Sequence, residues 1–240
     1  MRSPRMFRAC VEPPFAAKVS SDHMNTKSML AGFSKAFLAV VLLAAAGAAT
    51  AAVELKEGVN YKLLQPSQPT NVAPGKVEVV EVFWYACGHC YLLEPKLEAR
   101  NRSGRPANAE LVRVPATWNN MLKTHARVFY TMELLGRQNL HPEIWREINL
   151  KGNRLDTPES IEAFFTSHGV SKVDFQKAFS SFAVDSKIMR AEDMNRRYKI
   201  TGTPTVIVNG KYVTDVGMAG SEENLFQVIN ALVAKEKPRA

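Results

Sequence analysis

Two cysteines in the segment CGHC, residues 87–90, are the side chains best suited to chemistry in this sequence. Two intervening residues let both sulfur atoms reach disulfide geometry across one helical turn. A helical pattern follows the segment, and a helix N-terminus offers unpaired N–H groups and a positive dipole end that stabilise a thiolate. We therefore predict that Cys87 is the exposed, attacking sulfur and that Cys90 is the buried thiol that closes an internal disulfide.

His89 lies between the two cysteines and supplies a second group able to stabilise an anion. A stabilised thiolate makes the disulfide easier to reduce, and this makes the protein a stronger oxidant. The alternative is a surface histidine without a role in the reaction.

Metal and haem chemistry are the competing interpretations of the cysteine pair. A c-type haem site needs a histidine directly after the second cysteine, but Tyr91 stands there. A structural zinc site needs four ligands, and the sequence contains no second C-x-x-C or C-x-x-H. Cys87, His89 and Cys90 still leave a weak copper or zinc carrier as an alternative. We expect neither a bound metal nor a cofactor.

The N-terminal segment has the pattern of a secretion signal. Lys27 and Lys35 precede an apolar stretch at residues 36–46, and Ala-Thr-Ala follows at 49–51. A basic region, a short apolar core and an A-x-A site predict a signal peptide over residues 1–51 and a mature start at Ala52. A membrane anchor is the alternative, because the uncharged run just reaches spanning length.

The leader also bears on the cysteine count and the charge. Residues 1–23 fit neither leader nor fold, so translation from Met24 is an alternative start. Cleavage would remove Cys10 and leave a single close pair, which reactivity explains better than the need for a staple. The formal charge of +8 falls to +4 after residue 51, and no Lys/Arg block remains, so we expect no nucleic-acid binding.

The elements that must position the cysteines follow from periodicity. A β-branched and aromatic run at 76–85 predicts a buried strand that leads directly into the motif. A helix between this strand and a second one at 111–115 fits a βαβ crossover. Further patterns predict helices at 91–100, 121–136, 142–149, 158–168, 173–181, 185–198 and 225–233, and a hairpin of strands at 205–208 and 211–214. The order predicts a mixed sheet with an all-helical insertion.

Two glutamates near the motif are candidate site residues. Glu81 lies inside the apolar strand, where burial of a carboxylate is costly, and strand parity places it opposite Glu78. We predict a buried acid with a raised pKa that relays the proton of Cys90, and the alternative is a solvent-facing side chain. Glu94 follows Cys90 by one helical turn, where either an effect on the redox potential or a solvated position is expected.

Thr203 and Pro204 precede the first strand of the hairpin. Most X-Pro bonds are trans, so the dipeptide alone favours trans. A proline that opens an apolar strand is nevertheless unusual, because it cannot donate to the ladder, and this position favours a functional bend.

These motifs together resemble the DsbA family of bacterial periplasmic disulfide oxidases, which have a thioredoxin fold. The resemblance rests on FWYACGHCY at 83–91 and TGTPT at 201–205, and it spans residues 52–237. It implies that Cys87 is the nucleophile and Cys90 its disulfide partner. Gly88 stands where the best-studied member has proline, which gives the Cys-Gly-His-Cys typical of protein disulfide isomerases.

The resemblance also implies roles for the flanking residues and partners. Glu81 and Glu94 match the family's acidic residues near the site, and Thr203 and Pro204 match its cis-proline loop. The implied partners are unfolded exported proteins with reduced cysteines and a membrane quinone-linked reoxidase of the DsbB type. We expect a periplasmic monomer, with a disulfide reductase or isomerase of similar fold as the alternative function.

The predicted fold class is α/β, a thioredoxin fold with an all-helical inserted domain. The thioredoxin-like domain would comprise residues 52–118 and 189–240. The helical insertion would occupy residues 119–188.

Overall fold

The computed structural model describes residues 53–236, which fall within one compact unit. The predicted leader, its cleavage site and Cys10 lie outside the described residues. The strands are β1 (Lys62–Leu63), β2 (Val77–Phe83), β3 (Ala109–Pro115), β4 (Thr205–Val208) and β5 (Tyr212–Thr214). The helices are α2 (Gly88–Ser103), α3 (Asn120–Leu134), η1 (Gln138–Leu140), α4 (His141–Asn149), α5 (Pro158–Ser167), α6 (Lys172–Phe179), α7 (Phe182–Arg197), α8 (Val216–Ala219) and α9 (Glu222–Lys235).

The five strands form one mixed sheet in the order β1-β5-β4-β2-β3. β2 pairs with β3 in parallel and with β4 in antiparallel orientation. The helix between β2 and β3 confirms the predicted crossover, and the hairpin of β4 and β5 is also confirmed. β2 is therefore flanked on both sides and every one of its residues is buried, as the apolar run predicts.

The turn between β4 and β5 shows why glycine is required there. Asn209 and Gly210 both have positive φ, as a tight hairpin turn of this kind needs. A Cβ atom on Gly210 would lie 2.1 Å from the carbonyl oxygen of Gln68, so no larger residue fits. The loop before β2 therefore packs directly on the hairpin.

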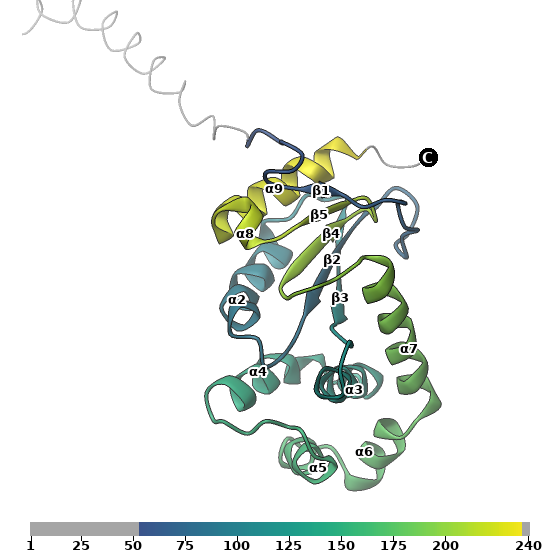
Figure 1. The fold of residues 1–240 in the computed structure, drawn as a ribbon. Coiled ribbons are helices and arrows are strands. Elements are labelled where there is room, and N and C mark those ends of the chain that lie inside the picture. Colours follow the sequence, from purple (N-terminus) through teal and green to yellow (C-terminus); the bar gives the residue numbers. More distant parts are fainter. Residues whose placement is uncertain (1–52, 237–240) are drawn as a thin grey trace, which may run out of the picture. The chain divides into compact units, whose positions relative to one another are not determined.

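Helices cover both faces of the sheet (Figure 1). On one face, Val77 and Val79 of β2 pack with residues of α9 and with Leu93 of α2. On the other face, Val80 and Val82 pack with residues of α3 and α7. Alternate residues of β2 thus point into two separate cores, as the period of two requires.

The helices α3 to α7 follow one another between β3 and β4, as expected for an all-helical insertion (Figure 1). The predicted domain boundary between Ile188 and Met189 falls inside α7. α7 also contacts α3 and contributes to the core against the sheet. The division into residues 52–118 with 189–240 and an insertion at 119–188 therefore stays a proposal.

Among the helices that the structure describes, none combines the length and the apolar character needed to cross a bilayer. This finding concerns residues 53–236 alone.

Candidate active site

Cys87 lies at the point where the sheet passes into helix α2. It is the residue that immediately precedes the helix, with extended backbone dihedral angles and no side-chain capping bond. Its own amide donates to the carbonyl of Trp84 at 2.9 Å, which closes a tight turn between β2 and the helix. Cys87 thus stands at a helix N-terminus. It is only half-buried, so other molecules can reach its sulfur.

Cys90 lies one turn into the helix and is fully buried. The two cysteines are reduced and are not joined in a disulfide. A hydrogen bond to Cys87 and burial raise the pKa of the Cys90 thiol far above its ordinary value. The two sulfurs therefore differ as predicted, with one accessible and one enclosed.

The pKa of Cys87 moves in the opposite direction. The hydrogen bond from the Cys90 thiol, followed by bonds from the Thr203 side chain and from the backbone N–H groups of Cys90 and His89, lowers the pKa of Cys87 to about 5. Burial opposes this shift but does not outweigh it. At neutral pH the Cys87 sulfur is thus a thiolate, the form that attacks disulfides and leaves from them readily.

His89 takes part through its backbone. Its side chain is exposed, and the group that lowers the pKa of Cys87 is its amide. A role for the imidazole stays a prediction.

The loop before β4 brings residues from the other end of the chain to Cys87. The Cys87 thiol donates to the carbonyl oxygen of Thr203 at 3.3 Å. The Thr203–Pro204 peptide bond is cis, which confirms the expectation from the family resemblance and not the one from the dipeptide alone. The loop thus places the backbone carbonyl of Thr203 beside the reactive sulfur.

Glu81 is enclosed on the α2 side of the sheet. Its side chain is 1% exposed, and neither carboxylate oxygen has a hydrogen-bond partner within the described residues. Burial and the nearby charge of Glu94 raise the pKa of Glu81 to about 8, although Arg113 opposes them. The burial that we predicted for Glu81 is confirmed, and the solvent-facing alternative is wrong.

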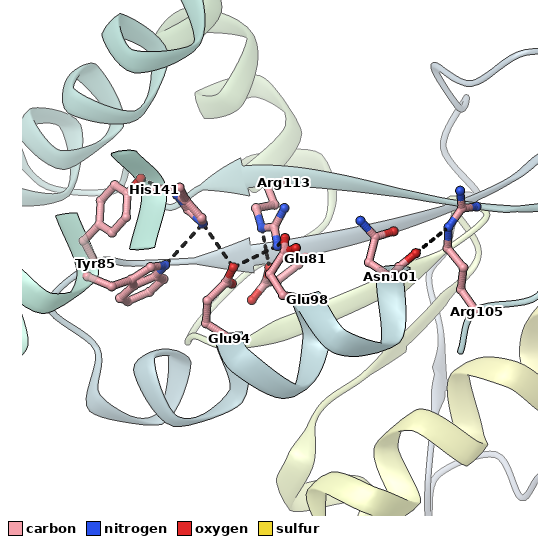
Figure 2. Close-up of polar contacts among 9 residues, drawn as sticks. Glu81, Tyr85, Glu94, Glu98, Asn101, Arg105, Arg113 and His141 are labelled. Atoms are coloured by element: carbon pink, nitrogen blue, oxygen red, sulfur yellow. Dashed lines mark hydrogen bonds and ion pairs between the residues drawn. The ribbon is translucent and has the colours of Figure 1, made fainter. Parts of the chain in front are cut away.

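Arg113 of β3 connects Glu81 to two further carboxylates (Figure 2). Its Nε lies 3.5 Å from Glu81 Oε2, and its Nη2 donates to Glu94 Oε1 at 2.9 Å and also to Glu98. Glu94 is buried, so its solvated alternative is wrong as well. One guanidinium cannot neutralise three carboxylates, and the charge excess favours a proton on the most enclosed of them, Glu81.

A histidine and two aromatic residues complete this buried cluster (Figure 2). His141 Nε2 lies 3.3 Å from Glu94 Oε1, and His141 Nδ1 lies 2.6 Å from the hydroxyl of Tyr85. Trp145 donates its indole N–H to His141 at 3.2 Å. A chain of polar contacts therefore runs from Tyr85, in the turn before Cys87, through His141 to the carboxylate of Glu94 and on to Arg113.

Arg113, His141 and Tyr85 were not predicted as site residues from the sequence. One signal for Arg113 was available, because it is a charged residue in the middle of an apolar strand, as Glu81 is. The two are direct partners in the parallel register of β2 and β3. His141 and Tyr85 carried no comparable signal, since their contact joins α4 to a turn that lies over fifty residues earlier.

A cavity of about 740 Å³ lies beside the cluster and not at the cysteines. Glu94, Arg113, His141 and Trp145 line it, together with the outer face of α2. Within residues 53–236, no three His, Cys, Asp or Glu side chains are arranged to hold a metal ion.

Comparison with known proteins gives a consistent result. Residues 106–228 match the model of the DSBA-like thioredoxin domain family. The chain is 38% identical over 193 residues to the thiol:disulfide interchange protein DsbA of Pseudomonas syringae pv. tomato, with 80% of this chain and 89% of the relative covered. It is 35% identical over 195 residues to DsbA of Pseudomonas aeruginosa, with 81% and 92% covered.

Solved structures agree with the sequence relatives. The crystal structure of Pseudomonas aeruginosa DsbA superposes with a TM-score of 0.71 at 35% identity and covers 75% of this chain and 94% of that one. The oxidoreductase NmDsbA1 from Neisseria meningitidis superposes with a TM-score of 0.66 at 27% identity, with 75% and 93% covered.

Proposed function

This chain belongs to the DSBA-like thioredoxin family and is a thiol:disulfide oxidoreductase that introduces disulfide bonds by exchange with substrate proteins. From this premise we propose that Cys87 and Cys90 form the redox-active disulfide. The observation that carries the proposal is the pKa of Cys87, lowered to about 5 at an accessible helix N-terminus, beside a Cys90 whose pKa is raised.

The exchange begins with a substrate thiolate that attacks Cys87 in the oxidised protein. A bond forms between the two sulfurs, the Cys87–Cys90 bond breaks, and Cys90 leaves as a thiolate. Glu81 carries a proton at neutral pH, because its pKa is raised to about 8, and it gives this proton to Cys90. Because Glu81 protonates it, Cys90 does not have to remain a buried thiolate, and its departure becomes more favourable.

A second substrate thiolate then attacks the substrate sulfur of the mixed disulfide. The substrate disulfide forms, the bond to Cys87 breaks, and Cys87 leaves as the thiolate that its surroundings stabilise. A leaving thiol with a lower pKa leaves faster, so the forces that stabilise this thiolate also drive oxidation of the substrate.

Substrate chains would lie along the Thr203–Pro204 loop in extended form. The Thr203 carbonyl beside Cys87 offers a backbone hydrogen bond that does not depend on the substrate's side chains. This contact suits unfolded exported proteins with reduced cysteines. A DsbB-type membrane quinone-linked reoxidase would then restore the disulfide.

The proposal also includes a periplasmic location and a monomeric state. The predicted mature start at Ala52 gives the check for location, since protein recovered from cells should begin there. Sedimentation equilibrium of the purified protein checks the oligomeric state.

The decisive experiment mixes oxidised protein with a reduced, unfolded substrate that has two cysteines. We expect substrate oxidation by the wild type, none by Cys87→Ser, and a trapped mixed disulfide with Cys90→Ser. Equilibration with glutathione should show the disulfide more readily reduced than that of a reductase. A disulfide that resists reduction by glutathione would favour the reductase alternative instead.

A further inference from the structure

His141, the first residue of α4, is a buried titratable side chain that the exchange steps above do not use. It contacts both segments that flank the cysteines. Its Nδ1 lies 2.6 Å from the hydroxyl of Tyr85, two residues before Cys87. Its Nε2 lies 3.3 Å from Glu94, one turn after Cys90. One side chain of the helical segment therefore bridges the two sides of the active site (Figure 2).

Tyr85 anchors the turn that presents Cys87. Its side chain is fully buried, and its ring packs edge-on against Trp145 at 4.8 Å between centroids. Its carbonyl accepts a hydrogen bond from the Asn149 side chain at 2.8 Å. Within residues 53–236, His141 is the hydrogen-bond partner of the Tyr85 hydroxyl. Because a buried hydroxyl without a partner is costly, removal of His141 would loosen this anchor.

The other nitrogen of His141, Nε2, lies near both Trp145 and Glu94 but cannot form a hydrogen bond with both at once. Trp145 donates its N–H to Nε2, and this requires a lone pair on that nitrogen. Glu94 can only accept when ionised, so a bond to it requires a hydrogen on the same nitrogen. Nδ1 contacts Tyr85 in both cases. The contact to the turn before Cys87 is therefore the constant one.

We propose that His141 is a positioning residue for disulfide exchange, which acts on Cys87 by holding Tyr85 and the turn before helix α2. The thiolate of Cys87 depends on bonds from Cys90, from Thr203 and from backbone N–H groups at the start of the helix. These bonds require the sulfur to stay in one place. The inference rests on the proposed role of Cys87 as the exchanging thiol.

The test uses variants that each keep a different contact. His141→Leu removes the contacts to Tyr85 and to Glu94. His141→Asn keeps a polar group near the Nδ1 position and so retains the bond to Tyr85. His141→Gln keeps a polar group near the Nε2 position instead. Tyr85→Phe removes the hydroxyl from the other side. His168→Asn is the matched control, because His168 is a half-buried histidine of the same helical segment that bonds to Phe164.

The readouts are the pH titration of the Cys87 thiolate by its ultraviolet absorbance and the equilibrium of the disulfide with glutathione. His141→Leu and Tyr85→Phe should each raise the Cys87 pKa and lower the equilibrium constant for reduction by about threefold to tenfold, the value of one hydrogen bond. His141→Asn should stay near the wild type, His141→Gln should not, and His168→Asn should change nothing. The double variant of Tyr85 and His141 should show less than the sum of the single effects.

Two outcomes would overturn the inference. One is a His141→Leu protein with a lower melting temperature but an unchanged Cys87 titration, which would make His141 a purely structural residue. The other is additive effects of Tyr85→Phe and His141→Leu. If His141→Leu does not fold, Tyr85→Phe carries the same test with the imidazole in place. A wild-type titration that persists in Cys87→Ser would instead contradict the proposed function.

Discussion

Strand β2 buries two glutamates on opposite faces of the sheet, and the two carboxyl groups have different surroundings. Glu78 points toward the face covered by α7, and its Oε1 accepts the backbone N–H of Asn71 at 3.0 Å. Glu81 points toward α2, and neither of its oxygens accepts a hydrogen bond within the described residues. Burial raises the pKa of both carboxyl groups.

The difference shows that burial alone does not identify a functional acid. The carboxyl of Glu78 holds the loop before β2 in place, so one of its oxygens already has a structural use. The oxygens of Glu81 are free of such bonds, and its charge is among the causes that raise the pKa of Cys90. The proton exchange that we propose between Glu81 and the enclosed thiol would therefore break no hydrogen bond that holds the fold.

The largest expected effect is on the loss of stability as the pH rises from 4.5 to 8. The raised pKa of Glu81 makes the folded state hold a proton that the unfolded state has lost, so stability decreases as pH rises from the unfolded value near 4.5 to about 8. In the wild type this loss raises the unfolding equilibrium constant by about tenfold per pH unit, and Glu81→Gln removes it. Urea unfolding of the oxidised protein between pH 4.5 and pH 8 measures it.

Glu78→Gln is the matched control for this experiment. Its effect has the same sign, because the pKa of Glu78 is also raised by burial, but the bond from Asn71 opposes that shift and makes it smaller. If stability changed with pH by the same amount in the two variants, the distinction between Glu78 and Glu81 would be lost.

The next effect is kinetic and concerns the Cys90 proton. Glu81→Gln should slow the attack of Cys90 on a mixed disulfide at Cys87 by about 100-fold. The reason is that the variant lacks the carboxylate that forms when Glu81 gives its proton to Cys90 and that takes the proton back when Cys90 attacks. Stopped-flow release of a peptide from the mixed disulfide measures the step. Glu78→Gln should release the peptide at the wild-type rate, and a slowing in both variants would assign the effect to altered packing.

A third effect is the difference in melting temperature between the reduced and the oxidised protein. The pKa of Cys87, lowered to about 5 in the folded protein, stabilises the reduced fold at pH values above 5, and the gain grows up to the ordinary thiol pKa of 9. Reduced protein should therefore melt several degrees higher than oxidised protein at pH 7, and the gap should widen from pH 5 to pH 9. The small loop between the cysteines gives the disulfide little entropic benefit to set against this.

Calorimetry of both redox forms at pH 5, 7 and 9 tests this response. Glu78→Gln should leave the gap unchanged, since Glu78 is not among the largest causes that shift the pKa of either cysteine. A higher melting temperature for the oxidised form at every pH would contradict the oxidase assignment.

The smallest expected effect concerns individual hydrogen bonds to Cys87. Thr203→Val removes the side-chain bond that helps to lower the Cys87 pKa, so alkylation by iodoacetamide at pH 5 should slow by about twofold to threefold. His89→Ala keeps the backbone N–H and should slow it less. Thr214→Val removes a hydroxyl bond to the backbone carbonyl of Asn60, in the turn before β1, and should leave alkylation unchanged.

Local sequence patterns predicted most of the framework. The β-branched and aromatic run at residues 76–85, the helix start after Cys87 and the Asn209–Gly210 turn each depend on neighbouring residues, and each is present in the structure. The final helix was predicted at 225–233 and begins three residues earlier, after Ser221, whose hydroxyl accepts the Asn224 N–H. The two-residue strand β1 was not predicted, because so short an edge strand has no periodicity of its own.

The candidate site was predictable only where chemistry is concentrated in a motif or a family resemblance. Cys87, Cys90 and Glu81 were expected in their observed positions. The bonds of His141 to Tyr85 and Glu94 depend on how α4 packs against the sheet, and no local pattern encodes that packing. The contribution of the His89 backbone, as opposed to its imidazole, likewise depends on the final direction of N–H groups at the helix start.

The pairing of β2 with β4 also determines when the active site exists. Synthesis proceeds from the N-terminus, so β2, the cysteine motif and β3 emerge long before Thr203 and β4. Until then one edge of β2 has no partner, and Cys87 lacks the Thr203 side chain that helps to lower its pKa. An incomplete chain therefore carries two cysteines without the full thiolate stabilisation, and its oxidising power arises only when the last part of the sheet is in place.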